Sequence, residues 1–264
     1  MTARIKQLFE HTKAENRAAL ITFIMGGDPD IDTTLALLDG LSQSGADIIE
    51  IGIPFSDPMA DGPVIEAAGK RAIAKGITLK KILGAVQQFR QNNNATPIIL
   101  MGYYNPIYRY GVSGFCKDAS AAGVDGLIIV DLPPEEELEI VPHLDATNLR
   151  LIRLVAPTSN EERMKKITAS ASGFVYYISV TGVTGAATAK DDDLAARLEI
   201  LRKNTPLPVA VGFGIKTAEQ VNAAAKHADA VVVGSALVKI IAESKDAVSA
   251  ASIFVKGLAS GLGK

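Results

Sequence analysis

The sequence predicts an α/β fold, namely a single (β/α)8 barrel (a TIM barrel) over residues 1–264, with one extra helix at its N-terminus. Three observations lead to this prediction. Short apolar runs alternate regularly with amphipathic stretches. No linker, low-complexity segment or change of composition divides the chain. The length of 264 residues is close to the roughly 250 residues that eight βα units need.

The predicted strands are runs rich in β-branched residues, because strands buried on both faces of a parallel sheet form continuous apolar segments. They are Leu20–Ile24, Ile48–Ile51, Pro97–Met101, Leu127–Val130, Leu151–Val155, Phe174–Ile178, Pro208–Val211 and Ala230–Val233.

Helices are expected between these strands, where apolar residues recur at helical spacing or where proline and acidic residues mark a first turn. The extra helix is expected at Arg4–Thr12, and its apolar side (Ile5, Leu8 and Phe9) should cover the floor of the barrel. The other expected helices are Thr33–Leu41, Leu79–Phe89, Glu135–Leu144, Thr217–Lys226 and Ala236–Glu243.

A weak internal repeat supports the same architecture. Ser44-Gly45-Ala46-Asp47 precedes the second predicted strand, Ala122-Gly123-Val124-Asp125 the fourth, and His227-Ala228-Asp229-Ala230 the eighth. In the first two copies, glycine stands where a helix commonly ends in a left-handed cap before the chain turns into a strand.

The composition excludes several classes of protein. A net charge of −2 argues against a nucleic-acid binder, and 48% hydrophobic residues exclude wholesale disorder. Cys116 is the only cysteine, so no internal disulfide framework is possible. No apolar run reaches the roughly 20 residues of a membrane-spanning helix, and the N-terminus has no signal-peptide pattern. We therefore expect a cytoplasmic protein.

Active sites of such barrels lie at the carboxyl ends of the strands. The first candidates there are carboxylates. Glu50 stands inside an apolar strand, where an unpaired carboxylate is costly. It is either a functional group or half of a structural ion pair with Arg153. The loop Gly52–Pro63 then carries Asp57 and Asp61, which either cap turns or place one carboxylate opposite Glu50 for general acid and base steps.

Two glycine-rich segments follow the last two predicted strands, Gly212-Phe213-Gly214-Ile215 and Gly234-Ser235-Ala236-Leu237. In this order they predict a phosphate site, because bare backbone amides and a helix N-terminus favour an anion. The loop Ser179–Thr188 is small, polar and glycine-bearing, which favours a lid over a plain surface loop.

The residues that other reaction types require are missing from the expected positions. No predicted strand contains lysine, which disfavours a Schiff-base aldolase. The histidines His11, His143 and His227 do not cluster, so no metal site is expected. No dinucleotide fingerprint follows the first strand. The residues thus indicate a phosphorylated substrate handled by carboxylates without a cofactor.

The segments Glu50–Pro58 and Ala60–Pro63 closely resemble the signature of the tryptophan synthase α subunit family. Further matches follow in the family's order between Phe23 and Ile241, so the resemblance covers nearly the whole chain. They are Tyr103–Pro106, Asp131–Pro133, Gly182–Gly185, Gly212–Gly214 and Gly234-Ser235. Met101, Gly102 and Arg153 depart from the family's pattern.

The resemblance implies a lyase of tryptophan biosynthesis that cleaves indole-3-glycerol phosphate into indole and glyceraldehyde 3-phosphate by a retro-aldol step. Glu50 and Asp61 match the two catalytic carboxylates. The residues that match the indole pocket are Phe23, Met101, Tyr103, Ile128, Tyr176 and Phe213. Those that match the phosphate grip are Gly185, Gly214, Gly234 and Ser235, and Thr184 matches the lid residue that locks near Asp61.

The resemblance also implies a partner. This is a β subunit that carries pyridoxal phosphate and receives indole through a tunnel within an αββα complex, so no cofactor is expected on the present chain. Two other hypotheses remain open: a non-catalytic activator of the β subunit, and another phosphate-binding barrel enzyme, such as a sugar-phosphate isomerase.

Overall fold

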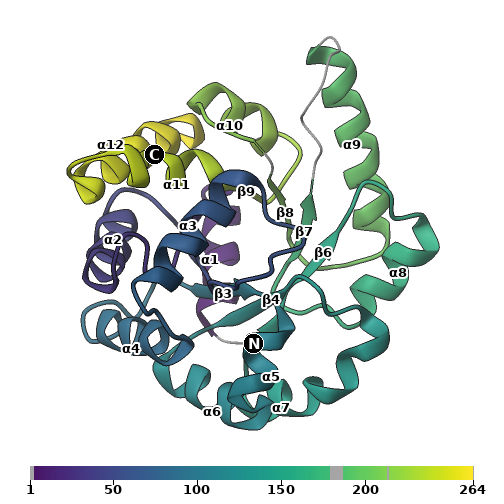
Figure 1. Ribbon diagram of the computed structural model, residues 1–264. Helices are drawn as coiled ribbons and strands as arrows, with labels where there is room; N and C mark the ends of the chain where they lie inside the picture. Colours follow the sequence, from purple (N-terminus) through teal and green to yellow (C-terminus); the bar gives the residue numbers. More distant parts are fainter. Residues whose placement is uncertain (1–2, 179–186, 213, 264) are drawn as a thin grey trace.

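The computed structural model describes residues 3–178, 187–212 and 214–263, and within them nine parallel strands form a nearly closed barrel surrounded by helices (Figure 1). The strands follow one another around the barrel in the order β5-β4-β3-β2-β1-β9-β8-β7-β6. This arrangement confirms the predicted (β/α)8 barrel. The bounds are β1 Ala19–Met25, β2 Ile48–Gly52, β3 Ile98–Gly102, β4 Gly126–Ile129, β5 Arg150–Leu151, β6 Arg153–Val155, β7 Val175–Ile178, β8 Val209–Gly212 and β9 Ala230–Val233.

The ninth strand arises because the predicted run Leu151–Val155 is divided at Ile152. On one side, the Ile152 amide still donates to the Leu127 carbonyl of β4, at 2.9 Å. On the other side, Ser172 takes the place of a strand at the level of Leu151, since its hydroxyl accepts from the Leu151 amide at 2.8 Å and its amide donates to the Leu151 carbonyl. The ladder to β7 begins only at Arg153. The two short strands are one barrel unit.

The helices alternate with the strands and lie outside them, with α1 at the N-terminal end. Their bounds are α1 Ala3–Ala14, α2 Ile31–Gln43, α3 Pro63–Ala74, α4 Leu79–Phe89, α5 Tyr104–Tyr110, α6 Val112–Ala122, α7 Val141–Thr147, α8 Glu161–Ala169, α9 Ala187–Lys203, α10 Ala218–Ala225, α11 Ser235–Glu243 and α12 Ala247–Ala259, with 3₁₀ turns η1 Pro134–Glu139 and η2 Ser260–Leu262.

One predicted helix, Glu135–Leu144, is wrong as a continuous element. The structure has the 3₁₀ turn η1 up to Glu139, and α7 begins at Val141. The reason is Pro142, which lacks the backbone N–H that an uninterrupted helix would use there and so is confined to the first turn of α7. The other predicted helices are confirmed with slightly different ends, and α4 matches residue for residue.

The barrel interior is filled by alternate residues of each strand, and α1 closes its floor. Ile5 and Phe9 of α1 belong to the same buried cluster as the inward residues Ile21, Ile48 and Phe174. The rings of Phe9 and Phe174 lie 5.8 Å apart. The N-terminal helix therefore covers the barrel floor, as the sequence predicts.

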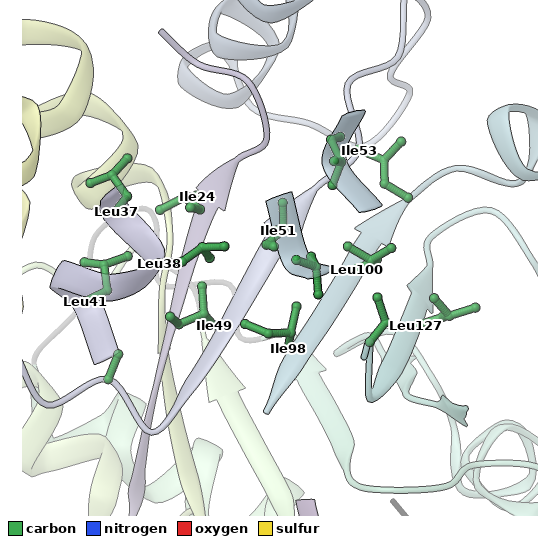
Figure 2. Close-up of a cluster of buried hydrophobic side chains, with 14 of the residues drawn as sticks. Ile24, Leu37, Leu38, Leu41, Ile49, Ile51, Ile53, Ile98, Leu100 and Leu127 are labelled. Carbon is green, nitrogen blue, oxygen red and sulfur yellow. The ribbon is translucent and has the colours of Figure 1, made fainter. Parts of the chain in front are cut away.

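The other strand residues point outward and pack against the helices. Figure 2 shows this layer beside α2, where Leu37, Leu38 and Leu41 face side chains of the neighbouring strands, including Ile24 and Ile49. Alternation between the two layers fixes the direction of every strand side chain, because successive residues of a strand point to opposite faces. It decides which polar strand residues lie inside the barrel.

The glycine caps are also where the sequence places them. Gly123 ends α6 in a left-handed conformation, with φ of 91°. Gly45 follows the last residues of α2 with φ of 103°.

Candidate active site

Glu50 points into the barrel from β2, because it alternates with the outward residues Ile49 and Ile51. Its side chain is 1% exposed, and within the described part of the chain its Oε1 atom has no hydrogen-bond partner. This burial raises the pKa of Glu50 to about 8. At neutral pH the group is therefore protonated, and it has a proton to donate.

Arg153 is not the partner of Glu50. The neighbours of Arg153 in the chain, Ile152 and Leu154, are the ones that join the interior cluster, so the arginine points outward. There it donates to the Leu132 carbonyl at 2.8 Å and forms an ion pair with Glu137 of η1. The alternative of a Glu50–Arg153 ion pair inside the barrel is thus wrong, because the two side chains lie on opposite faces of the strands.

An apolar wall surrounds Glu50. Phe23 of β1 lies opposite it in the strand register, and Met101 and Ile128 are paired on the next two strands. Tyr176 stands on β7, and burial together with the negative charge of Glu50 raises the pKa of its hydroxyl. The two groups are therefore near enough to interact electrostatically.

Glycines make room for the two aromatic rings of this wall. A Cβ atom on Gly52 would lie 2.6 Å from Cζ of Phe23, and one on Gly212 would lie 2.6 Å from Oη of Tyr176. Any larger residue at the ends of β2 and β8 would displace these rings. The space beside Glu50 is thus shaped by the glycines as well as by the aromatic residues.

Asp61 lies on the loop between β2 and α3, and Tyr103 holds this loop over the end of β3. The Tyr103 hydroxyl donates to Oδ1 of Asp61 at 2.9 Å and accepts from the amide of Ala60 at 3.0 Å. The ring of Phe55 lies 5.5 Å from that of Tyr103. Tyr103 is 3% exposed, so this buried side chain anchors the loop.

The start of the same loop explains Gly102, which departs from the family's pattern. The amide of Ile53 donates to the Met101 carbonyl at 2.7 Å. This bond brings the Ile53 side chain so close that a Cβ atom on Gly102 would lie 2.9 Å from Cβ of Ile53. Glycine at this position permits the close approach of the loop to the strand.

Asp61 differs from Glu50 in its surroundings. It is half-buried, and burial raises its pKa, although the hydrogen bond from Tyr103 lowers it; the nearby charge of Glu66 adds a smaller upward effect. Burial and the hydrogen bond to Asp61 raise the pKa of Tyr103 to about 12, although the hydrogen bond from the Ala60 amide lowers it, so the tyrosine stays a donor to Asp61. The Glu50 carboxyl is buried, and the described residues offer its Oε1 no hydrogen-bond partner, whereas the Asp61 carboxyl is half-buried and accepts a hydrogen bond from a hydroxyl.

Two of the predicted phosphate residues, Gly234 and Ser235, lie beside this wall. Gly234 is the N-cap of α11 and Ser235 its first residue, with no side chain capping the helix. The backbone amides of this first turn are open to an anion. A Cβ atom on Gly234 would lie 3.5 Å from Cβ of Phe23, so the helix end adjoins the apolar wall. Gly214 has φ of 72°.

Three of the predicted site residues, Thr184, Gly185 and Phe213, lie outside the described residues, as does most of the expected lid. Among the residues that the structure does describe, no three His, Cys, Asp or Glu side chains gather as metal ligands. In the same part of the chain, no helix has the length and apolar character needed to cross a membrane.

One ion pair near this site was not predicted from the sequence. Asp28, just after β1, is 2% exposed and paired with Arg71 of α3. The segment Gly26-Gly27-Asp28-Pro29 carried a signal, since a charged residue in a glycine turn at the end of a strand is a candidate for a site. Its partner lies 43 residues further along the chain, which no local pattern indicates.

Nearly the whole chain matches one protein family. The family model described as tryptophan synthase alpha chain matches residues 9–260. The solved tryptophan synthase subunit alpha of Legionella pneumophila str. Paris is 40% identical, with a TM-score of 0.92 and coverage of 98% of each chain. A chain from Aquifex aeolicus VF5 is 37% identical, with a TM-score of 0.90 and the same coverage. A chain of tryptophan synthase from M. tuberculosis in its aminoacrylate-bound form is 35% identical, with a TM-score of 0.88, covering 98% of this chain and 99% of that one.

Proposed function

The chain belongs to the tryptophan synthase alpha chain family, lyases of tryptophan biosynthesis that cleave indole-3-glycerol phosphate, and from this premise we propose which of its residues carry the reaction. Glu50 and Asp61 are the catalytic pair. The observation that carries this assignment is the buried carboxyl of Glu50, which has a pKa of about 8 and whose Oε1 has no hydrogen-bond partner among the described residues, beside an apolar wall. Groups with such pKa values serve general acid catalysis near neutral pH.

The proposed steps balance protons between the two carboxyls. Protonated Glu50 gives its proton to ring carbon C3, while ionised Asp61 takes the proton of ring nitrogen N1, which yields a neutral indolenine. Glu50, now ionised, then takes the proton of the side-chain hydroxyl. The C–C bond breaks, its electrons enter the ring, and Asp61 returns the proton to N1. Indole and glyceraldehyde 3-phosphate leave, and both carboxyls are back in their starting states.

The surrounding residues fit this substrate. The planar ring would lie against Phe23, Met101, Ile128 and Tyr176, because an apolar slot is what an indole requires. The phosphate would bind at the N-terminus of α11, at Gly234 and Ser235, together with Gly214. Tyr103, matched to the indole pocket by resemblance, has a second task here, which is to hold Asp61 in place.

The chain's own residues supply all the proton transfers, so we propose that it needs no cofactor and that pyridoxal phosphate is bound by the partner β subunit. The rim of the barrel supports a docking place for that subunit. Met59, Tyr108 and Leu138 follow the ends of three consecutive strands and are 80%, 63% and 80% exposed. We propose that this rim faces the β subunit in an αββα complex in the cytoplasm, through which indole passes to the second site.

The experiment is indole release from indole-3-glycerol phosphate by the purified chain, with and without a β subunit. Slow release that rises strongly with the partner is the expected result. Glu50→Gln serves as the control for chemistry. If this variant releases indole as fast as the parent, the chain is not the catalyst through Glu50, and a non-catalytic activator becomes the better description. Preference for a sugar phosphate without an indole would identify a different barrel enzyme.

A further inference from the structure

Asp28 and Arg71 form a two-pronged ion pair beside the proposed active site. Nε and Nη2 of Arg71 donate to the two carboxylate oxygens of Asp28 at 2.8 and 2.7 Å. The Asp28 side chain is 2% exposed, while that of Arg71 is 43% exposed. Such a fork fixes direction as well as distance, because both bonds hold only in one relative orientation.

Asp28 stands on a turn that is anchored to the strand of Glu50. The Gly26 amide donates to the carbonyl of Gly52 at 3.0 Å, two residues beyond Glu50. The Gly27 amide donates to the Thr34 hydroxyl at 2.8 Å. Gly27 has φ of 84°, and a Cβ atom there would lie 2.2 Å from Ile77. The turn is therefore packed on both sides, and the Asp28 carboxylate is fixed relative to β2.

Arg71 stands on the helix that sets the position of Asp61. Only Gly62 separates Asp61 from Pro63, the first residue of α3, and no side chain caps this helix end. Movement of α3 along or around its axis would therefore strain the hydrogen bond that Tyr103 donates to Asp61 and shift the carboxyl.

The fully buried side of α3 consists of the small residues Ala68, Gly69 and Ala72, and Val64 and Ile65 are partly buried against the same apolar cluster, which includes Phe23 and Met25 of β1. These apolar contacts have no preferred direction, so they do not fix the orientation of the helix as a two-bond ion pair does. Within the described residues, the two bonds from Arg71 to Asp28 are the side-chain hydrogen bonds that join α3 to another element.

We propose that Asp28 and Arg71 are positioning residues that set α3, and through it Asp61, relative to Glu50. The ion pair then links the supports of the two catalytic carboxyls. Glu50 is connected to it through β2 and the Gly26–Asp28 turn, and Asp61 is connected to it through α3 and Arg71. This inference rests on the proposed roles of Glu50 and Asp61. Asp28 and Arg71 would then affect the rate of the chemical step without taking part in it themselves.

The test compares variants of this pair with variants of a matched pair at the opposite end of the barrel. Arg71→Gln removes the fork, Arg71→Lys keeps the charge but loses the paired geometry, and Asp28→Asn keeps the shape but loses the charge. Arg17→Gln is the matched control, since Arg17 also forms two bonds with a nearly buried aspartate, Asp47, at 2.9 and 3.2 Å. Lys70→Gln controls for the exposed pair with Glu66 on the same helix.

We expect kcat to fall about 10- to 100-fold in Arg71→Lys, Arg71→Gln and Asp28→Asn, because displacement of a catalytic group by about 1 Å costs on that order. KM should change less than about threefold, and the affinity for glycerol phosphate should be unchanged, because α11 packs on α3 through Val238 and no side-chain hydrogen bond of the described residues joins the two helices. Arg17→Gln should lower Tm at least as much and leave kcat at the parent value. The double variant Asp28→Asn, Arg71→Gln should lose no more than either single variant, since all three lack the same fork.

The inference is overturned if Arg71→Lys keeps kcat within about twofold of the parent, or if Arg17→Gln loses as much kcat for an equal loss of Tm. Should Arg71→Gln fail to fold, Arg71→Lys and Asp28→Asn decide. Asp61→Asn is measured alongside. If that variant turns over normally, the role of Asp61 itself is wrong; if it is inactive while Arg71→Lys is normal, only the positioning role is rejected.

Discussion

Carboxylates stand at both ends of this barrel in opposite surroundings. At the N-terminal end, Asp47, Asp125 and Asp229, one from each copy of the internal repeat, each accept a hydrogen bond from a backbone amide near the start of the neighbouring strand. The donors are Leu20, Ile98 and Val209, at 2.7, 2.9 and 2.8 Å. Each aspartate also pairs with arginine, namely Arg17, Arg90 with Arg4, and Arg202.

At the C-terminal end, Asp28 is also paired with an arginine, Arg71, but the two proposed catalytic carboxyls differ from it. Glu50 has an oxygen with no hydrogen-bond partner among the described residues, and Asp61 has a tyrosine hydroxyl in place of a cation. A carboxylate that binds backbone amides and arginine joins neighbouring strands together. A carboxyl in a dry, cation-free place holds its proton to a higher pH and can pass it on. This comparison indicates that structural and catalytic carboxyls differ more in their hydrogen-bond and ion-pair partners than in their burial.

The largest expected effect separates the two ends by activity. Glu50→Gln and Asp61→Asn should each lower indole release about 1000-fold, since loss of a general acid or base costs on the order of 10²–10⁴. Asp125→Asn should leave kcat at the parent value. Steady-state assays with indole-3-glycerol phosphate measure this. Equal losses for Asp125→Asn and Asp61→Asn would remove the distinction.

Stability should show the reverse order. Asp125→Ala leaves the arginines Arg4 and Arg90 without their common partner, and Arg90 is 8% exposed. Breaking a buried pair in this way should lower the free energy of unfolding by about 3–5 kcal/mol. Urea unfolding followed by circular dichroism checks it, with Glu10→Ala, whose ion pair with Lys6 is exposed, as the control near zero. A loss for Asp125→Ala no greater than that of the control would contradict the structural role.

The pH dependence of stability sharpens the comparison for Glu50. Its pKa is about 8 in the folded chain and 4.5 when the group is exposed to water, so its contribution to stability is fully present below pH 4.5 and is lost as pH rises through 8. Glu50→Gln lacks this loss. The variant should therefore become more stable than the parent between pH 4.5 and 8, by at most roughly 1.4 kcal/mol per pH unit. Parallel unfolding curves at pH 5, 6.5 and 8 would show that Glu50 is already ionised.

The phosphate end of the site allows a weaker effect. Gly234→Val places methyl groups where the anion would approach the first turn of α11, and it should raise the Kd for glycerol phosphate about tenfold, or roughly 1.4 kcal/mol. Calorimetric titration measures the change. Gly84→Val on the exposed side of α4, where a Cβ atom meets nothing within 4 Å, is the matched control. Unchanged affinity in Gly234→Val would move the phosphate elsewhere.

The smallest effect concerns a buried polar group with no proposed role. Thr22 of β1 is 0% exposed, and its hydroxyl has no partner among the described residues. It points to the helices, away from the site, since its neighbours Ile21 and Phe23 point inward. Thr22→Val should raise the free energy of unfolding by about 1 kcal/mol without changing kcat. A loss of stability would mean that the hydroxyl is satisfied, and that an unpartnered atom at Glu50 is weaker evidence for function.

The strands and the barrel could be predicted because their signal is local: apolar β-branched runs leave few alternatives. Glu50 stood out for the same reason, as a charge within such a run. The inward or outward direction of a side chain depends on the register of the whole barrel, and this is why Arg153 was a plausible partner in the sequence and is none in the structure.

The remaining features depend on contacts between distant segments. The repeat containing Asp47, Asp125 and Asp229 was visible, but the amides that these aspartates bind belong to other strands. The hydroxyl of Tyr103 and the fork between Asp28 and Arg71 join residues about 40 positions apart. No periodicity or motif records such pairs, because only the closed barrel brings them together.

The division of the fifth strand at Ile152 has a consequence for amide hydrogen exchange. A closed ring of strands has no edge from which to open, whereas this ring has a seam beside β5, where Ser172 takes the place of a strand and the ladder to β7 begins only with β6. Opening should begin there, so the amides of β5 and β6 should exchange before those of β1 and β2. In the strand order β1 lies farthest from the seam, with β2 and β9 on either side of it. The barrel can therefore breathe on one side while Glu50 stays in place on the other.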